Sequence, residues 1–171
     1  MLGGDIFYGI HLRRKNNVFK ITNYRCRNCV RAPWCACTSL IDDSDVDIWA
    51  GLIQDEGYRA LVGTDGVGDP MITSSANGYE FEVFFYGCTD KENCRDIQFS
   101  VVFDMEDGMS LTRAQDFNLE KRWAKVYLDE ESDPRLEMDE NLYGGVSETN
   151  FSDTLDWWVI IMNDFMEFID F

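Results

Sequence analysis

YEFEVFFY (residues 79–86) and DIQFSVVFD (residues 96–104) are the two stretches that decide the fold. In both, apolar side chains stand at every second position, and polar residues such as Glu80, Glu82 and Gln98 stand between them. A period of two is typical of a strand with one face on the core and the other toward solvent. The short polar loop between the two stretches therefore predicts an antiparallel hairpin.

Two further strands and a helix are expected ahead of this hairpin. Four apolar residues have the spacing that places side chains on one face of a helix: Val46, Trp49, Ala50 and Ile53. Residues 58–64 and 70–74 are predicted as strands joined by the turn at residues 65–69. The glycines in and beside this turn also suit a phosphate loop, but such a loop needs a helix after it, and here a strand follows. We therefore interpret the segment as a hairpin turn.

A helix, a second hairpin and a long final helix are expected after residue 104. Thr112 and Gln115 have the spacing of a capping box, and the side chains expected to face the core are Leu111, Ala114 and Phe117. Strands are predicted at residues 124–128 and 136–142 because apolar and polar residues alternate there. The candidate caps of the final helix are Asn150 and Asp153.

The final helix carries two apolar sets. Its main seam repeats at steps of four and three and consists of Phe151, Leu155, Trp158, Met162, Phe165 and Ile169. The second set comprises Trp157, Ile160, Ile161, Phe168 and Phe171. Either the protein's own sheet buries this second set, or the set forms a surface for a partner or a second copy. For the second case, the predicted partner-binding residues are Trp157, Ile160, Ile161 and Phe168.

The element order is helix, four strands, helix, two strands, helix, which indicates an α+β fold with an antiparallel sheet of about six strands. Charge divides the chain of 171 residues into two parts. Residues 1–40 hold seven basic residues and one acid, whereas residues 41–171 hold eight basic and 31 acidic residues. We therefore expect a basic, cysteine-containing and poorly ordered arm at 1–40, followed by one acidic α+β domain at 41–171.

Four of the six cysteines lie in the arm, at Cys26, Cys29, Cys35 and Cys37. Four thiolates can hold zinc, but the spacer between the two pairs is shorter than in zinc ribbons. Disulfides and an arm without any site are the alternatives. The other two cysteines, Cys88 and Cys94, flank the loop of the central hairpin. They are within disulfide reach if they face each other, and two buried free thiols are the alternative.

Composition excludes several classes of function for the domain. The only histidine is His11, in the arm, so residues 41–171 cannot form a Ser-His-Asp or Cys-His catalytic site or a histidine-ligated metal site. An acidic domain repels phosphate backbones, so nucleic acid is not an expected partner. The candidates for a carboxylate-based, metal-dependent hydrolase are Asp65, Asp69, Glu137 and Asp139, and a solvated acidic face is the alternative explanation of these residues.

Residues 45–170 resemble the YbjN family, bacterial proteins described as sensory transduction regulators. The resemblance rests on short motifs in a fixed order: Gly57-Tyr58-Arg59-Ala60, Gly68-Asp69-Pro70-Met71-Ile72, Phe85-Tyr86-Gly87-Cys88 with Cys94 and Gln98-Phe99, Tyr127-Leu128-Asp129 with Asp133-Pro134, Leu136-Glu137-Met138-Asp139, Gly144-Gly145-Val146 and Asn150-Phe151. This chain has Phe117-Asn118 where family members often have Trp-Asn. The arm has no counterpart in the family.

The resemblance implies a fold similar to that of type III secretion chaperones, which are small acidic proteins that bind partner segments. It implies no catalytic residues. We therefore expect a non-enzymatic, chaperone-like regulator without a cofactor, which binds a protein partner or a second copy of itself. A zinc-stabilised adaptor that uses the arm cysteines is a further alternative. No signal peptide or membrane-spanning run is recognised, so a cytoplasmic location is expected, with the periplasm as the alternative.

Overall fold

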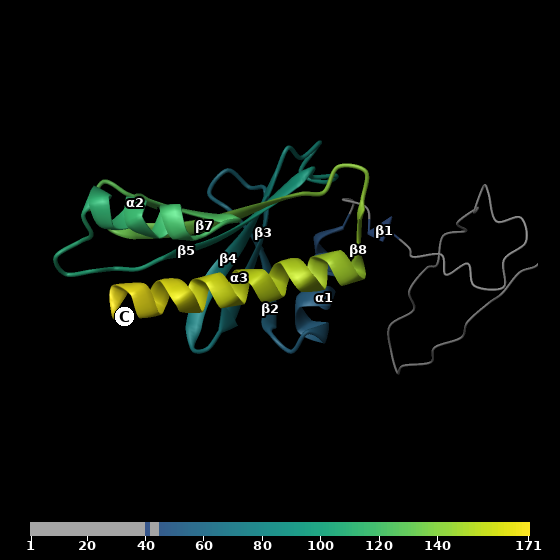
Figure 1. Cartoon of the computed structure of the whole chain (residues 1–171). Helices are drawn as coiled ribbons and strands as arrows, with labels where there is room; N and C mark the ends of the chain where they lie inside the picture. Colours follow the sequence, from purple (N-terminus) through teal and green to yellow (C-terminus); the bar gives the residue numbers. More distant parts are fainter. Residues whose placement is uncertain (1–39, 42–44) are drawn as a thin grey trace, which may run out of the picture. The chain divides into compact units, whose positions relative to one another are not determined.

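The computed structural model describes residues 40–41 and 45–171, which form a mixed α+β fold (Figure 1). Its main sheet has six antiparallel strands in the order β2-β3-β4-β5-β7-β6. The strands are β2 (Arg59–Thr64), β3 (Pro70–Ala76), β4 (Tyr79–Tyr86), β5 (Asp96–Val102), β6 (Ala124–Leu128) and β7 (Pro134–Asn141). Two short strands, β1 (Leu40–Ile41) and β8 (Val146–Ser147), form a separate pair. The helices are α1 (Val46–Asp55), α2 (Leu111–Glu120) and α3 (Glu148–Ile169).

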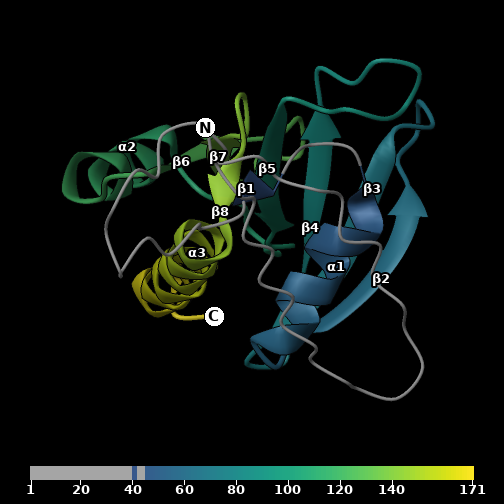
Figure 2. The same cartoon turned by 90° about the vertical axis from the view of Figure 1, so that its right-hand side faces the viewer.

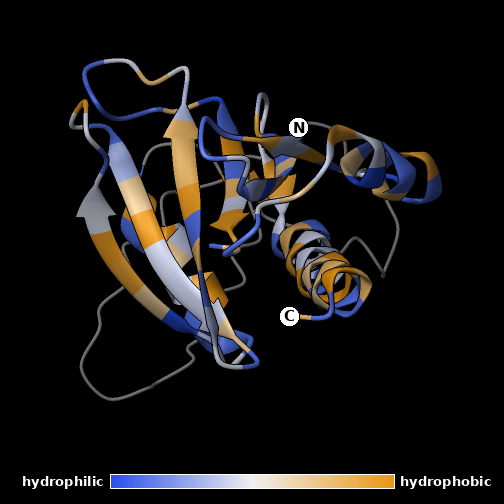
Figure 3. Ribbon diagram, turned by 90° about the vertical axis from the view of Figure 1, so that its left-hand side faces the viewer, coloured by the Kyte–Doolittle hydropathy of each residue, from blue (hydrophilic) through white to orange (hydrophobic). Residues whose placement is uncertain are grey.

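This architecture confirms the predicted α+β class and the six-stranded antiparallel sheet. The hairpin predicted from residues 79–86 and 96–104 is the β4–β5 pair, in which Val83 lies opposite Phe99. The arm predicted at residues 1–40 lies outside the described residues, apart from Leu40. The alternation that predicted the strands is visible as hydrophobic and hydrophilic bands along the sheet (Figure 3).

The core lies between one face of the sheet and the helices α1 and α3, which lie on the same side of the sheet (Figure 2). Trp158 of α3 is fully buried. The centre of its ring lies 5.6 Å from the ring centre of Phe99 and 5.7 Å from that of Phe81. Trp49 of α1 contacts Phe151 of α3 edge-on at 5.0 Å. All six residues of the predicted seam on α3 are buried. Aromatic packing therefore holds α3 against the centre of the sheet and α1 against α3.

Three details of the helices differ from the prediction. The cap of α2 is Ser110, whose hydroxyl accepts the Arg113 N–H, and not the predicted Thr112. The cap of α3 is Ser147, whose hydroxyl accepts the Asn150 N–H. Leu111, which was predicted to face the core, is exposed, because at 3.6 residues per turn it lies about 120° around α2 from the buried Phe117. Each true cap has an extended backbone, which lets a short hydroxyl reach the first free amides of the helix.

Asn118 attaches α2 to β6, the strand at one edge of the sheet. Its side-chain amide donates to the Val126 carbonyl at 2.9 Å, and its side-chain oxygen accepts the Val126 N–H at 2.7 Å. Val126 is buried, so both of its backbone groups depend on this one side chain. Asn118 therefore takes the place of a neighbouring strand at this edge.

We expect Asn118→Ala to lower the free energy of unfolding by about 2 kcal/mol, because it leaves a buried N–H and a buried C=O without partners. Urea denaturation followed by circular dichroism measures the change. The matched control is Asn163→Ala, since the one hydrogen bond of the Asn163 side chain among the described residues is an exposed one, accepted from Asn77. Equal losses for the two variants would contradict this role of Asn118.

Candidate functional site

The solvent-facing side of α3 has acidic residues around an apolar centre. Trp157 is 43 % exposed and Ile160 is 48 % exposed, and a spacing of three residues makes them neighbours on one helix face. The acidic residues of the same helix are Glu148, Asp153, Asp156, Asp164 and Glu167, and α3 contains no Lys or Arg. This helix therefore presents apolar side chains within a negative surrounding.

Trp123 lies beside this face, in the connection between α2 and β6. Its side chain is 69 % exposed, and with Trp157 it borders a hollow of about 190 Å³ that is also lined by Glu120, Lys121, Arg122, Ile161 and Asp164. The backbone of Trp123 has φ +76°, a region that bulky residues avoid and that is often found at functional sites. We call Trp123, Trp157 and Ile160 the tryptophan surface.

Two of the four predicted partner-binding residues are covered by the protein itself. Ile161 is only 3 % exposed. Phe168 packs against Phe117 of α2 at 5.3 Å, and the Arg113 guanidinium lies 5.0 Å from the centre of its ring. The residue pattern of α3 alone could not separate Phe168 from Trp157 and Ile160, because only the fold shows that α2 covers Phe168 and leaves the other two exposed.

The pattern of the sequence does not identify Trp123 as a candidate residue. It lies between a helix and a strand, where no periodic pattern assigns a residue to a surface. The available signal was a large aromatic residue in a short polar connection, next to Lys121 and Arg122. Only the fold brings this connection alongside α3.

Acidic side chains near the tryptophan surface are mostly free of ion pairs. Asp164 is the exception, since its carboxylate lies 2.5 Å from the Lys121 Nζ. Within residues 40–41 and 45–171, no ion pair involves Asp153, Asp156 or Glu167. Unpaired carboxylates around an apolar patch attract basic groups and repel acidic ones.

A second group of polar residues lies on the sheet face opposite the core. Glu137 and Asp139 share this face, as predicted, and the Lys125 Nζ lies 3.2 Å from a Glu137 oxygen and 3.4 Å from an Asp139 oxygen. Tyr127 donates to Glu137 at 2.8 Å, and Gln98 donates to Asp139 at 2.7 Å. The two carboxylates are thus held in a hydrogen-bonded network.

Electrostatics keep the basic and phenolic groups of this network protonated. Partial burial acts to lower the pKa of Lys125, but the hydrogen bond and charge of Glu137, together with Asp139, outweigh it and raise this pKa. Burial raises the pKa of Tyr127, and the hydrogen bond to Glu137 raises it further. At neutral pH both side chains are therefore protonated and act as hydrogen-bond donors.

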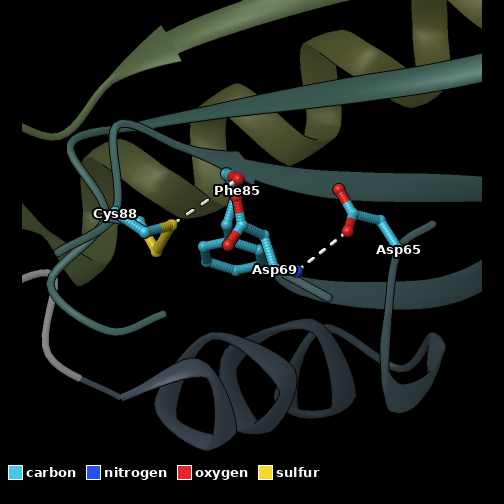
Figure 4. The surroundings of a disulfide bond; sticks show 5 residues. Asp65, Asp69, Phe85 and Cys88 are labelled. Atoms are coloured by element: carbon cyan, nitrogen blue, oxygen red, sulfur yellow. Dashed lines mark hydrogen bonds between the residues drawn. A yellow bond between two sulfur atoms is a disulfide. The ribbon is translucent and has the colours of Figure 1, made fainter. Parts of the chain in front are cut away.

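The remaining predicted carboxylates, Asp65 and Asp69, lie in the β2–β3 turn. The Asp65 carboxylate accepts the Val67 N–H at 3.0 Å and the Asp69 N–H at 2.8 Å, and these two bonds close the turn. The bond from Asp69 is drawn in Figure 4. This arrangement is typical of an aspartate that stabilises a tight turn. It agrees with the hairpin interpretation of residues 65–69 and accounts for Asp65 without a catalytic role.

Cys88 and Cys94 are joined as a disulfide in the structure, at the end of the β4–β5 hairpin (Figure 4). Cys94 is buried, and the Cys88 sulfur lies 3.6 Å from the Phe85 carbonyl oxygen. The enclosed loop contains three non-glycine residues with positive φ, namely Asp90, Lys91 and Asn93. The cross-link therefore joins the two strand ends across an irregular loop.

We expect the double variant Cys88→Ser/Cys94→Ser to lose about 2 kcal/mol of stability, since closing a loop this short removes only a modest amount of unfolded-state entropy. Chemical denaturation of the full chain and the variant, each with and without reductant, measures the effect. Reductant should destabilise only the parent protein. A parent protein that is insensitive to reductant would show that the two thiols are free.

The predicted zinc ligands Cys26, Cys29, Cys35 and Cys37 lie outside the described residues. Among residues 40–41 and 45–171, no three His, Cys, Asp or Glu side chains are grouped so that they could hold a metal ion. The carboxylates Glu137 and Asp139 have Lys125 between them, and a bound ammonium group disfavours a cation at the same place.

One family comparison bears on this arrangement. A family model described as "Putative bacterial sensory transduction regulator" matches residues 45–171. The chain belongs to the YbjN family. The matched region begins at Asp45, the cap of α1, so the YbjN domain includes the whole six-stranded sheet and the tryptophan surface. Searches among curated proteins and among solved structures found no match.

Membership confirms the resemblance inferred from the sequence motifs. The description of the YbjN family names a regulator and no enzymatic reaction. The likeness to secretion chaperones stays a prediction, because no solved structure matches. None of the described helices of the YbjN domain is both long enough and apolar enough to cross a membrane.

Proposed function

We propose that this YbjN protein is a non-enzymatic regulator that works by binding a protein partner, in the manner of a chaperone, through the tryptophan surface. The observation that carries the proposal is the hollow bordered by Trp123 and Trp157, with the exposed Ile160 beside Trp157 on the acidic helix α3. Tryptophan is enriched among the residues that dominate binding energy at protein interfaces. Burial of these side chains supplies the affinity.

The acidic residues of α3 define the partner's chemistry. Free carboxylates at Asp153, Asp156 and Glu167 favour a segment with Lys or Arg on both sides of an apolar centre. Such a segment fills the hollow with its apolar residues and places its cations near the acids. The excess of acid also keeps a protein with exposed tryptophans soluble.

Isothermal titration of the full chain with two synthetic peptides tests this proposal. The first peptide has about 15 residues, with an apolar helical stripe flanked by lysines, and the second has glutamates in place of the lysines. We expect the lysine peptide to bind with micromolar affinity and the glutamate peptide to show no binding. Equal affinity for both peptides, or no heat from either, would overturn the proposal.

A further inference from the structure

The two edge strands of the six-stranded sheet differ in how many of their outward-facing backbone groups have hydrogen-bond partners. At β6, the Asn118 side chain occupies the backbone groups of Val126. β2 forms the other edge and is the outermost strand in Figure 2. Its outer side has one partner among the described residues, the Gln54 side chain, which donates to the Ala60 carbonyl at 3.1 Å. The β2 edge is therefore largely open.

The register between β2 and β3 identifies which backbone N–H and C=O groups of β2 face away from the sheet. The Asp65 N–H donates to the Asp69 carbonyl at 2.9 Å, and β2 pairs antiparallel with β3 from that point, with Gly63 opposite Met71. In an antiparallel pair the bonded residues alternate along the strand, so Leu61 and Gly63 bond to β3. The N–H and C=O groups of Val62 and Thr64 consequently face away from the sheet.

The β2 edge lacks the features that usually prevent an exposed edge strand from pairing with a strand of another chain. Residues 60–64 carry no charge and no proline, and Leu61 and Val62 are 53 % and 45 % exposed. Exposed edge strands are normally blocked by lysine, proline, bulges or a covering element. An open, uncharged and apolar edge is suited to accept another strand.

We propose that a second copy of this chain pairs with this edge, β2 against β2, antiparallel and centred on Val62. This register places Val62 opposite Val62 of the second copy and Ala60 opposite its Thr64, so the groups that meet are those that face outward. The Ala60 carbonyl already accepts from Gln54 at 3.1 Å, and its second lone pair accepts the Thr64 N–H of the second copy. It also places Arg59 opposite Asp65 of the second copy, and the two-fold symmetry repeats this contact. The sequence of the edge is therefore complementary to itself in both hydrogen bonding and charge.

The charged residues at the ends of β2 are available for this contact. The Arg59 side chain is about half exposed, and its one ion pair within the described part of the chain is at 3.5 Å, with Glu80. One oxygen of Asp65 closes the turn, whereas no hydrogen bond among the described residues uses the other. The net charge of −17 opposes association of two copies, but repulsion beyond about 8 Å is screened at physiological ionic strength.

The dimer fraction rises with protein concentration by mass action. Light scattering on the full chain, from about 5 to about 500 µM in physiological salt, therefore tests the proposal. We expect a shift from monomer to dimer as concentration rises, and a monomer throughout for Val62→Lys. The matched control is Val102→Lys, which introduces the same charge at a similarly exposed valine on the central strand β5. This control should dimerise like the parent protein, and circular dichroism should show all three proteins folded.

Residue-resolved hydrogen exchange locates the contact. The Val62 and Thr64 amides should exchange quickly in dilute samples and slowly in concentrated ones, whereas the Leu61 and Gly63 amides should be protected at both concentrations. A chain that stays monomeric throughout would overturn the proposal. A dimer that survives Val62→Lys would also overturn it, and loss of that dimer in Trp157→Ala would place the contact on the tryptophan surface.

Discussion

Trp158→Ala is expected to lower the free energy of unfolding by about 4 kcal/mol, within the range for removing a large, fully buried aromatic side chain. Trp158 has no exposed surface, stacks on Phe99 and meets Phe81 edge-on, so its loss opens a cavity at the centre of the sheet. Urea denaturation followed by circular dichroism gives the change in stability directly.

The neighbouring tryptophan provides the control for this measurement. Trp157→Ala changes the same residue type on the same helix, but at a position that is 43 % exposed, and it is expected to cost less than about 1 kcal/mol. Similar losses for the two variants would mean that Trp157 belongs to the core and that the tryptophan surface does not exist as described.

Trp157→Ala is expected to weaken binding of the lysine peptide by at least about 30-fold, because a tryptophan at the centre of an interface contributes about 2 kcal/mol or more. Titration calorimetry with the parent protein and the variant measures the change. The reason for the loss is that Trp157 lines the hollow with Trp123, so its removal takes away one wall of the site.

A matched variant on the opposite side of the sheet shows whether the loss of peptide affinity is specific to the tryptophan surface or follows from the removal of any exposed aromatic side chain. Tyr86 is exposed to nearly the same extent as Trp157, but it lies on the sheet face that bears the Glu137 network. Tyr86→Ala should leave peptide affinity unchanged. If Tyr86→Ala weakens binding as much as Trp157→Ala does, the peptide is not held by the tryptophan surface.

Much of the fold could be predicted because strand alternation and helical spacing are local patterns. The alternation in residues 79–86 and 96–104 predicted β4 and β5, and the spacing from Phe151 to Ile169 predicted the buried seam of α3. The caps were assigned wrongly because several Ser, Thr, Asn and Asp residues lie near each helix start. Only the backbone conformation distinguishes Ser110 and Ser147 from the others.

The candidate site was less predictable because it depends on contacts between distant segments. Ile161 and Phe168 belong to the same apolar set as Trp157, and the sequence of α3 alone does not reveal that α2 covers Phe168. Trp123 joins the site only because the α2–β6 connection lies beside α3. The pattern along α3 therefore identifies Trp157 and Ile160, which are exposed, but it also includes Ile161, which is buried.

The tryptophan indole N–H signals in a proton–nitrogen NMR spectrum test the central claim most directly, that the YbjN domain acts by binding through the tryptophan surface. On addition of the lysine peptide to the full chain, we predict that the signals of Trp123 and Trp157 shift. Those of Trp49 and Trp158 should stay in place, because both side chains are buried in the core. Binding that leaves the Trp123 and Trp157 signals unmoved while the backbone signals of Glu137 and Asp139 shift would contradict the account.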